Sequence, residues 1–347
     1  MDSQPGCGRS GLFFAFANVT DRLRFHDGTD SRVQTNMIKI ASHAKADKTF
    51  KGLTLLMAAS IVAILLLMGA EMVRESLPSM RKFGWQFITG QDWDPVQGQF
   101  GALPYLYGSV VSSILALLLA TPLSIGTALF VTDIAPKKLG GAVAALVELL
   151  AAIPSVIYGL WGILVMVPWL QQTVEPFLID HFGFLPFFEG APYGVSMLAG
   201  VFILMIMVVP IITSITKEVL LAVPLSQKEA AYALGATRWE VLRVAVLPYA
   251  RSGILGAVIL GLGRAIGETM AVTMVIGNSP EISLSLLSPA YTMPSVIANE
   301  FAEASSKLHS AALMEIGLLL LAVTLAINIL ARLLIWSVTR GRKGGAA

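Results

Sequence analysis

The sequence predicts an all-α, polytopic membrane protein with six transmembrane helices. The 347 residues are 55% hydrophobic and only 13% charged, with a mean hydropathy of +0.74, whereas soluble domains are about 25% charged. Six apolar segments are long enough to cross about 30 Å of hydrocarbon. Lipid offers no partner to an unpaired backbone group, so each segment is expected to be a helix. The expected limits are 53–73, 106–132, 139–170, 193–216, 253–276 and 311–336.

The chain before the first apolar segment differs in character. Residues 1–50 are polar, mixed in charge and without periodicity, so they are expected to be a disordered cytoplasmic tail. Residues 51–340 then form the six-helix membrane domain, which includes a cytoplasmic loop at 217–251. The single cysteine, Cys7, excludes a disulfide framework.

Lysine and arginine are unevenly distributed between the two sides. With the N-terminus inside, the inner segments hold the basic tail, Lys137, Lys138, the loop 217–251 and the basic C-terminus. The outer segments hold only Arg74, Arg81, Lys82 and Lys307. Because positive residues collect on the cytoplasmic side, both termini and the loop are predicted to be cytoplasmic.

The loop 217–251 has the signals of a folded helical hairpin. Ser226 with Glu229, and Thr237 with Glu240, have the spacing of capping boxes. Gly235 is expected to provide a left-handed stop, and Pro248 to end the second helix. A polar helical hairpin on a membrane protein suits a soluble partner. The alternative is a loop that rests on its own transmembrane helices.

Arg264 and Glu268 are the informative charges inside the spans. Arg264 lies about eleven residues, or roughly 16 Å, into its expected helix, and Glu268 follows one turn later. A charge near the bilayer centre costs at least ~2.5–3.5 kcal/mol on insertion scales, so such residues usually face a polar path or a partner. We therefore favour a functional role, facing a polar path, over a purely structural ion pair. Glu268, Thr269 and Thr273 are predicted to share that path with Arg264.

Glu148 and Pro154 lie in the third expected span. Glu148 has three possible roles: pairing with Arg264, lining the path, or reaching back to the interface, and a structural role ranks first. Pro154 is a potential break in that helix.

Several chemistries are excluded by what the sequence lacks. No Gly-x-x-x-x-Gly-Lys-Ser/Thr segment occurs, so the chain is not expected to bind ATP itself. The four histidines fit no metal spacing, and no nucleophile is paired with a base, so no catalytic residue, metal or cofactor is expected. A net charge of +2 gives no reason to expect nucleic acid.

Residues 229–248 carry a family motif, with Ala245 in place of its usual isoleucine. The segment resembles the EAA motif of ABC importer permeases, which implies a type I ABC importer permease fold. In that family this segment is the coupling helix, which sits in a groove of a separate ATPase. The residues in register are Glu229, Ala230, Ala231, Gly235, Leu247 and Pro248.

Three further segments, at 100–108, 147–162 and 263–278, are similar to the PstC-type permeases of phosphate importers. The resemblance implies uptake of inorganic phosphate through a multi-pass subunit in the bacterial inner membrane. Arg264 would hold two phosphate oxygens at once, and Glu268 would keep the anion from binding too tightly. The implied partners are a homologous PstA-type permease, an ATPase dimer that binds ATP and magnesium, an extracytoplasmic phosphate-binding protein, and membrane lipid.

Other functions remain as alternatives. A permease for sulfate or molybdate would share the EAA motif, because that motif faces the ATPase. A secondary transporter predicts inverted repeats and coupling carboxylates, which are not apparent. A membrane scaffold would leave Arg264 and Glu268 unexplained.

Overall fold

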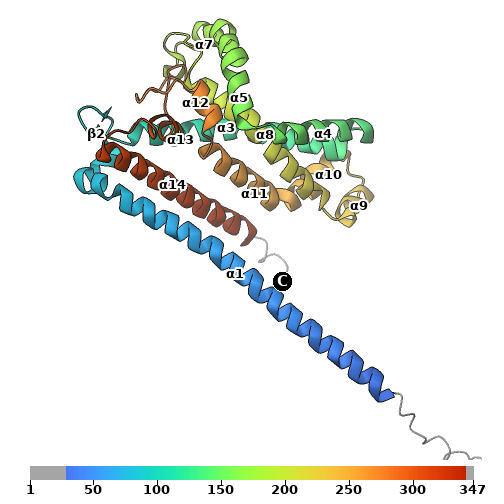
Figure 1. Cartoon of the computed structure of the whole chain (residues 1–347). Helices are drawn as coiled ribbons and strands as arrows, with labels where there is room; N and C mark the ends of the chain where they lie inside the picture. Colours follow the sequence, from blue (N-terminus) through green and yellow to red (C-terminus); the bar gives the residue numbers. More distant parts are fainter. Residues whose placement is uncertain (1–28, 341–347) are drawn as a thin grey trace, which may run out of the picture. The chain divides into compact units, whose positions relative to one another are not determined.

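The computed structural model describes residues 29–340, with side chains from Asp47 onward except at 334 and 337–340. Its elements follow one another along the chain as labelled in Figure 1. In order they are α1 (Thr29–Phe83), α2 (Gln86–Thr89), β1 (Trp93–Asp94), β2 (Gln99–Phe100), α3 (Leu103–Leu129), η1 (Phe130–Ile134), α4 (Lys137–Ala152), α5 (Ser155–Trp161), η2 (Gly162–Met166), α6 (Val167–Trp169), η3 (Leu170–Val174), α7 (Glu175–Phe182), η4 (Pro186–Phe188), α8 (Met197–Leu221), α9 (Leu225–Ala233), α10 (Arg238–Val241), η5 (Leu242–Val246), α11 (Leu247–Ile266), α12 (Met270–Val275), α13 (Met293–Glu300) and α14 (Lys307–Arg340). The four segments η1, η2, η3 and η5 are π-helical, and η4 is a 3₁₀ helix.

The chain divides into two units at Met68, within α1. The part of α1 before Gly69 is a continuous helix from Thr29, so residues 29–50 differ from the expected disorder. Residues 29–51 contain neither glycine nor proline, and helix propagation is easier than nucleation, so the helix of the apolar segment extends backward. Residues 1–28, the rest of the expected tail, lie outside the described residues.

The described residues contain six helices that are long and apolar enough to cross a membrane, which confirms the predicted fold class. The third and fifth differ most from their expected limits. The six are Asp47–Phe83, Leu103–Ile134, Ser155–Phe182, Met197–Leu221, Arg238–Ile266 and Lys307–Leu333. The only strands in the described part of the chain are β1 and β2, which form one short antiparallel ribbon.

The expected third span, 139–170, is two helices. Helix α4 ends at Ala152, and Ile153 is extended with ψ 128°. The residue before a proline avoids the helical region, so Pro154 separates α4 from the spanning helix that begins at Ser155. The Tyr158 hydroxyl bridges the break by donating to the Leu150 carbonyl at 2.8 Å.

Two spans continue through prolines by means of π-helical turns. Pro168 follows η2, Pro176 follows η3, and Pro248 follows η5, each in the first turn of the next α-helical segment. Proline lacks an N–H and clashes with the carbonyl four residues earlier, and a π-turn changes the hydrogen-bond register at that point. The prediction that Pro248 ends a helix is therefore wrong, because α10, η5 and α11 are continuous.

Helix α8 is the centre of the second unit and packs against α3, α4 and α11. Its side chains are buried along most of its length. The largest apolar cluster joins it to α3, α5, α11 and α12. This packing brings α5 and η2, in the N-terminal half of the third span, against α12, which follows the end of the fifth span where Arg264 lies.

Candidate functional site

The polar hairpin, defined as α9, the turn at 234–237 and α10, folds largely as predicted. Gly235 has φ +81°, a left-handed conformation that glycine adopts without steric cost. The Thr237 hydroxyl accepts the Glu240 N–H at 3.4 Å, and the Glu240 carboxylate accepts the Thr237 N–H at 2.8 Å. This is the predicted capping box. The box expected at Ser226 is absent, because α9 begins at Leu225 behind Pro224, which makes no side-chain cap.

A small apolar cluster attaches the polar hairpin to the spans. Val241 and Leu242 are buried against Ala128 at the end of α3 and Leu220 at the end of α8. Trp239, which shares a helix face with Leu242, is 63% exposed instead. The structure therefore uses Leu242 to anchor the polar hairpin and leaves the indole on the surface.

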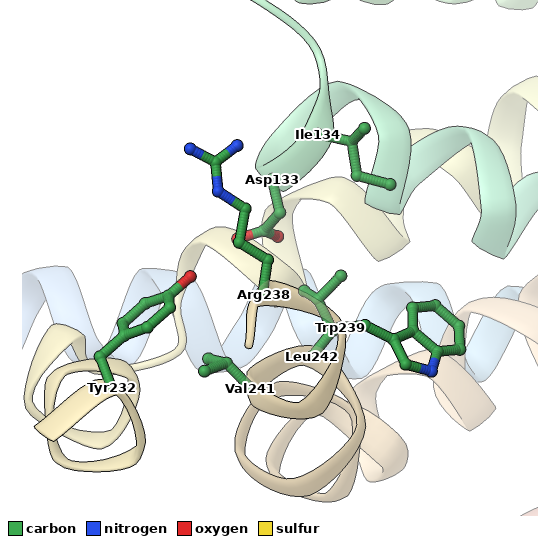
Figure 2. Close-up of a pocket in the computed structure, with 7 residues that line it drawn as sticks. All are labelled: Asp133, Ile134, Tyr232, Arg238, Trp239, Val241 and Leu242. Carbon is green, nitrogen blue, oxygen red and sulfur yellow. The ribbon is translucent and has the colours of Figure 1, made fainter. Parts of the chain in front are cut away.

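A hollow of about 220 Å³ lies beside the exposed indole (Figure 2). One wall comes from η1, and the other walls come from α9, α10 and the start of η5. It combines aromatic and aliphatic surface with two charged groups. Its lining residues are Asp133, Ile134, Tyr232, Arg238, Trp239, Val241 and Leu242.

The residues in register with the EAA motif divide into two groups. Glu229, Ala230 and Gly235 are exposed. Ala231, Leu247 and Pro248 are half-buried, and the first two of these pack on the apolar cluster beneath the polar hairpin. The motif thus supplies both an exposed small-residue surface and the contacts that hold it.

Sequence reasoning missed an ion pair next to the hollow. The Lys228 Nζ atom of α9 lies 2.7 Å from Oδ1 of Asp133 on η1. Both side chains are about four-fifths buried, at 20% and 18% exposure. No sequence signal pairs these residues, because 95 positions separate them.

Arg264 lies in a different setting from the expected continuous helix. Helix α11 ends at Ile266, and a non-helical stretch at 267–269 separates it from α12. Arg264 is therefore in the last turn of α11 rather than about eleven residues into a helix spanning 253–276. A cation is favourable near the carbonyl end of a helix, which is a local reason for its position.

Arg264 and Glu268 face one another across this break. An Nη atom of Arg264 lies 4.0 Å from Oε2 of Glu268, with side-chain exposures of 44% and 8%. Glu268 also accepts the Ala271 N–H, at 3.5 Å. The carboxyl is therefore buried and engaged at the start of α12, while the Arg264 side chain is partly exposed.

Thr269 and Thr273 are both half-buried near this break. The Thr273 hydroxyl donates to the Thr269 carbonyl at 2.7 Å. The Thr269 hydroxyl donates to the Gly267 carbonyl at 3.4 Å, close to the limit for a hydrogen bond. The four predicted path residues thus lie on one short segment, and both hydroxyl oxygens keep acceptor capacity.

Close packing against α5 holds α12 in place. A Cβ atom on Gly159 would lie 2.6 Å from the Met274 sulfur and 3.0 Å from the Ala271 Cα. A Cβ on Gly162 would lie 2.9 Å from a Val275 methyl. Glycine at these positions lets α5 and η2 of the third span approach α12, which follows the break.

Glu148 is not a partner of Arg264. Its carboxylate accepts from the Lys217 ammonium of α8 at 2.8 Å, which agrees with the structural role ranked first for it. Among the described residues, no group of three or more histidine, cysteine, aspartate or glutamate side chains is arranged to hold a metal ion.

Six apolar helices, an exposed polar hairpin and a partly open arginine at a helix break define a membrane transport permease. The family described as "binding-protein-dependent transport system inner membrane component" matches residues 120–340. The chain belongs to this family, and it is a transport component rather than an enzyme.

The chain resembles phosphate permeases in sequence over most of its length. It is 48% identical to the phosphate transport system permease protein PstC of Mesorhizobium japonicum over 281 residues, which cover 79% of this chain and 86% of that one. It is 45% identical to PstC of Haemophilus influenzae over 293 residues, covering 83% and 93%.

Solved structures share the fold at lower sequence identity. The bacterial alginate ABC transporter, solved with an alginate-bound periplasmic protein, has a chain that aligns with TM-score 0.55 and 17% identity, covering 83% of this chain and 94% of that one. The inward-facing MetNI methionine ABC transporter aligns with TM-score 0.50 and 17% identity, covering 67% and 94%. The chain therefore has the type I ABC importer permease fold.

Proposed function

We propose that this chain is a permease subunit of an ATP-driven importer and forms half of the membrane path for inorganic phosphate. The observation that carries the proposal is the high identity to PstC permeases over most of both chains. The partly open Arg264 guanidinium supports it, because a guanidinium offers paired donors that match phosphate oxygens.

The partners and orientation follow from the same proposal. A homologous permease of the PstA type completes the path, and an extracytoplasmic phosphate-binding protein delivers the anion. Both termini and the polar hairpin face the cytoplasm, in accordance with the positive charge there. A dimer of ATPase subunits, which binds ATP and magnesium, contacts the exposed residues Glu229, Ala230 and Gly235. This chain itself binds no cofactor.

Arg264 and Glu268 would act together on the passing anion. Glu268 is the more buried of the two and lies 4.0 Å from Arg264, so it offsets part of the positive charge without closing the guanidinium to other ligands. A fully unopposed cation would retain the anion, whereas a balanced one releases it. Thr269 and Thr273 would accept hydrogen bonds from a protonated phosphate.

The test is phosphate uptake by an Arg264→Gln variant in cells that lack their own phosphate permease. Uptake is expected to be lost while the complex still assembles and its ATPase still responds to phosphate-loaded binding protein. The control is Arg332→Gln, which changes an exposed arginine of the spanning helix α14. Undiminished uptake by Arg264→Gln would contradict the proposed path. Competition by sulfate or molybdate, but not by phosphate, would identify another oxyanion as the substrate.

A further inference from the structure

The ion pair between Lys228 and Asp133 joins the polar hairpin to the second span. Lys228 lies in the middle of α9, and Asp133 lies on η1, which continues α3. Their charged atoms are 2.7 Å apart, and both side chains are mostly buried. Burial reduces the screening that weakens exposed pairs, so this contact resists separation more than a surface ion pair does.

Helix α9 has few other attachments within the described part of the chain. None of its residues is fully buried. Ala231 packs on the cluster formed by η5 and the ends of α3 and α8, and Lys228 forms an ion pair with Asp133. The helix that carries Glu229 and Ala230 is therefore held to the second span mainly at Lys228.

Asp133 is itself firmly placed. Oδ1 binds Lys228, and Oδ2 accepts the Thr132 hydroxyl at 2.7 Å. Helix α4 begins four residues later and approaches η1 closely, because a Cβ on Gly140 would lie 2.9 Å from the Val131 carbonyl oxygen. Asp133 thus lies where the second span meets α4, and α4 packs on α8.

We propose that Asp133 is a positioning residue for energy coupling, which through Lys228 makes the second span move with the polar hairpin. This inference rests on the proposed function. The chain itself links the polar hairpin to α8 on one side and to η5 and α11 on the other. The ion pair adds a direct polar link to α3, which otherwise follows through the apolar cluster and through its packing on α8, where Ser124 donates to the Val209 carbonyl at 3.2 Å. A partner surface that fills the hollow of Figure 2 contacts η1 and the polar hairpin together, so both sides of the pair receive the same displacement.

The experiment uses the complete transporter in proteoliposomes, with ATP inside and phosphate-loaded binding protein outside. It measures phosphate transported per ATP hydrolysed for the wild type, Asp133→Asn, Lys228→Gln and the exchanged double variant Asp133→Lys with Lys228→Asp. Each single variant is expected to keep its ATPase activity and to lose about fivefold or more of the transport ratio, the scale of a typical coupling between sites. The exchanged variant is expected to recover most of that loss.

Glu148→Gln is the control. It breaks a more exposed carboxylate–lysine pair of similar length, 2.8 Å to Lys217, that joins α4 to α8 and not to the polar hairpin. Its transport ratio is expected to equal that of the wild type. A second measurement, the amount of assembled complex, separates coupling from folding.

Two results would overturn the inference. One is an unchanged transport ratio in both single variants. The other is a loss of assembled complex in the single variants that accounts for their whole loss of transport, since the pair would then be structural only. Failure of the proposed function has a different signature, because the wild-type complex itself would then show no ATP-driven phosphate uptake.

Discussion

Gly159 offers the sharpest test of how the third span supports the Arg264 site. A Cβ atom there would lie 2.6 Å from the Met274 sulfur, 3.0 Å from the Ala271 Cα and 3.4 Å from the Met270 oxygen. Carbon atoms in contact prefer about 3.5–4.0 Å. The Met274 side chain can turn away, but Ala271 Cα is backbone and moves only with α12. The Gly159→Val change adds two more methyl groups to the same contact.

The expected magnitude follows from the cost of overpacking, about 1–3 kcal/mol. If that strain is relieved by displacing α12, the population of the native arrangement of Glu268, Thr269 and Thr273 falls by about 5–150-fold. Initial phosphate uptake is expected to fall by a factor in that range at equal membrane level. Gly159→Ala should lose less, and adding Met274→Ala should recover part of the loss by removing the nearest contact.

The control is Gly126→Val, at a spanning position where an added Cβ meets no described heavy atom within 4 Å. It is expected to transport normally when the same initial uptake of labelled phosphate is measured. Full uptake by Gly159→Val, at wild-type abundance, would refute the argument that α5 positions the break. An equal loss in Gly126→Val would show that valine is harmful for a reason unrelated to α12.

Two further changes test local features of the fold. Thr237→Ala removes the capping box and is expected to destabilise the polar hairpin by about 1 kcal/mol, seen as faster amide hydrogen exchange over α9 and α10; unchanged exchange would contradict the cap's role. Glu175→Ala removes a fully buried carboxyl that accepts the Gly194 N–H at 2.8 Å and the Ser196 hydroxyl at 2.9 Å. Leaving both donors unpaired should cost about 2 kcal/mol or more and lower the Tm of the purified complex, whereas the exposed Glu189→Ala should not; equal Tm values would show that the buried contacts add no stability.

The polar hairpin was predictable because its signals are local. Gly235 and the Thr237–Glu240 pair act within one turn of the chain, so their conformations follow from a few neighbouring residues. The capping box expected at Ser226 and Glu229 does not form, and the reason is also local. Pro224 favours a helix that starts at Leu225, one residue before Ser226.

The breaks in the third and fifth spans were less accessible to sequence reasoning. Pro154 was recognised as a potential break, but the apolar run continues through it, and hydropathy alone does not register the extended residue 153. In the expected fifth span, 253–276, Gly267 interrupts the helix between two apolar stretches. The close approach of α5 to α12 holds the second stretch as a separate helix, and that contact joins residues more than a hundred positions apart.

The sequence by itself determined the number of spans and the polar hairpin, and it singled out Arg264 and Glu268 as candidates, because hydrophobic length, capping spacing and residue type are local properties. Only the tertiary structure decided that Arg264 lies at a helix end facing a buried Glu268, that Glu148 pairs with Lys217, and that Lys228 joins Asp133. These are contacts across breaks or between distant segments. They depend on which helices pack together, and no short-range pattern in the sequence encodes that choice.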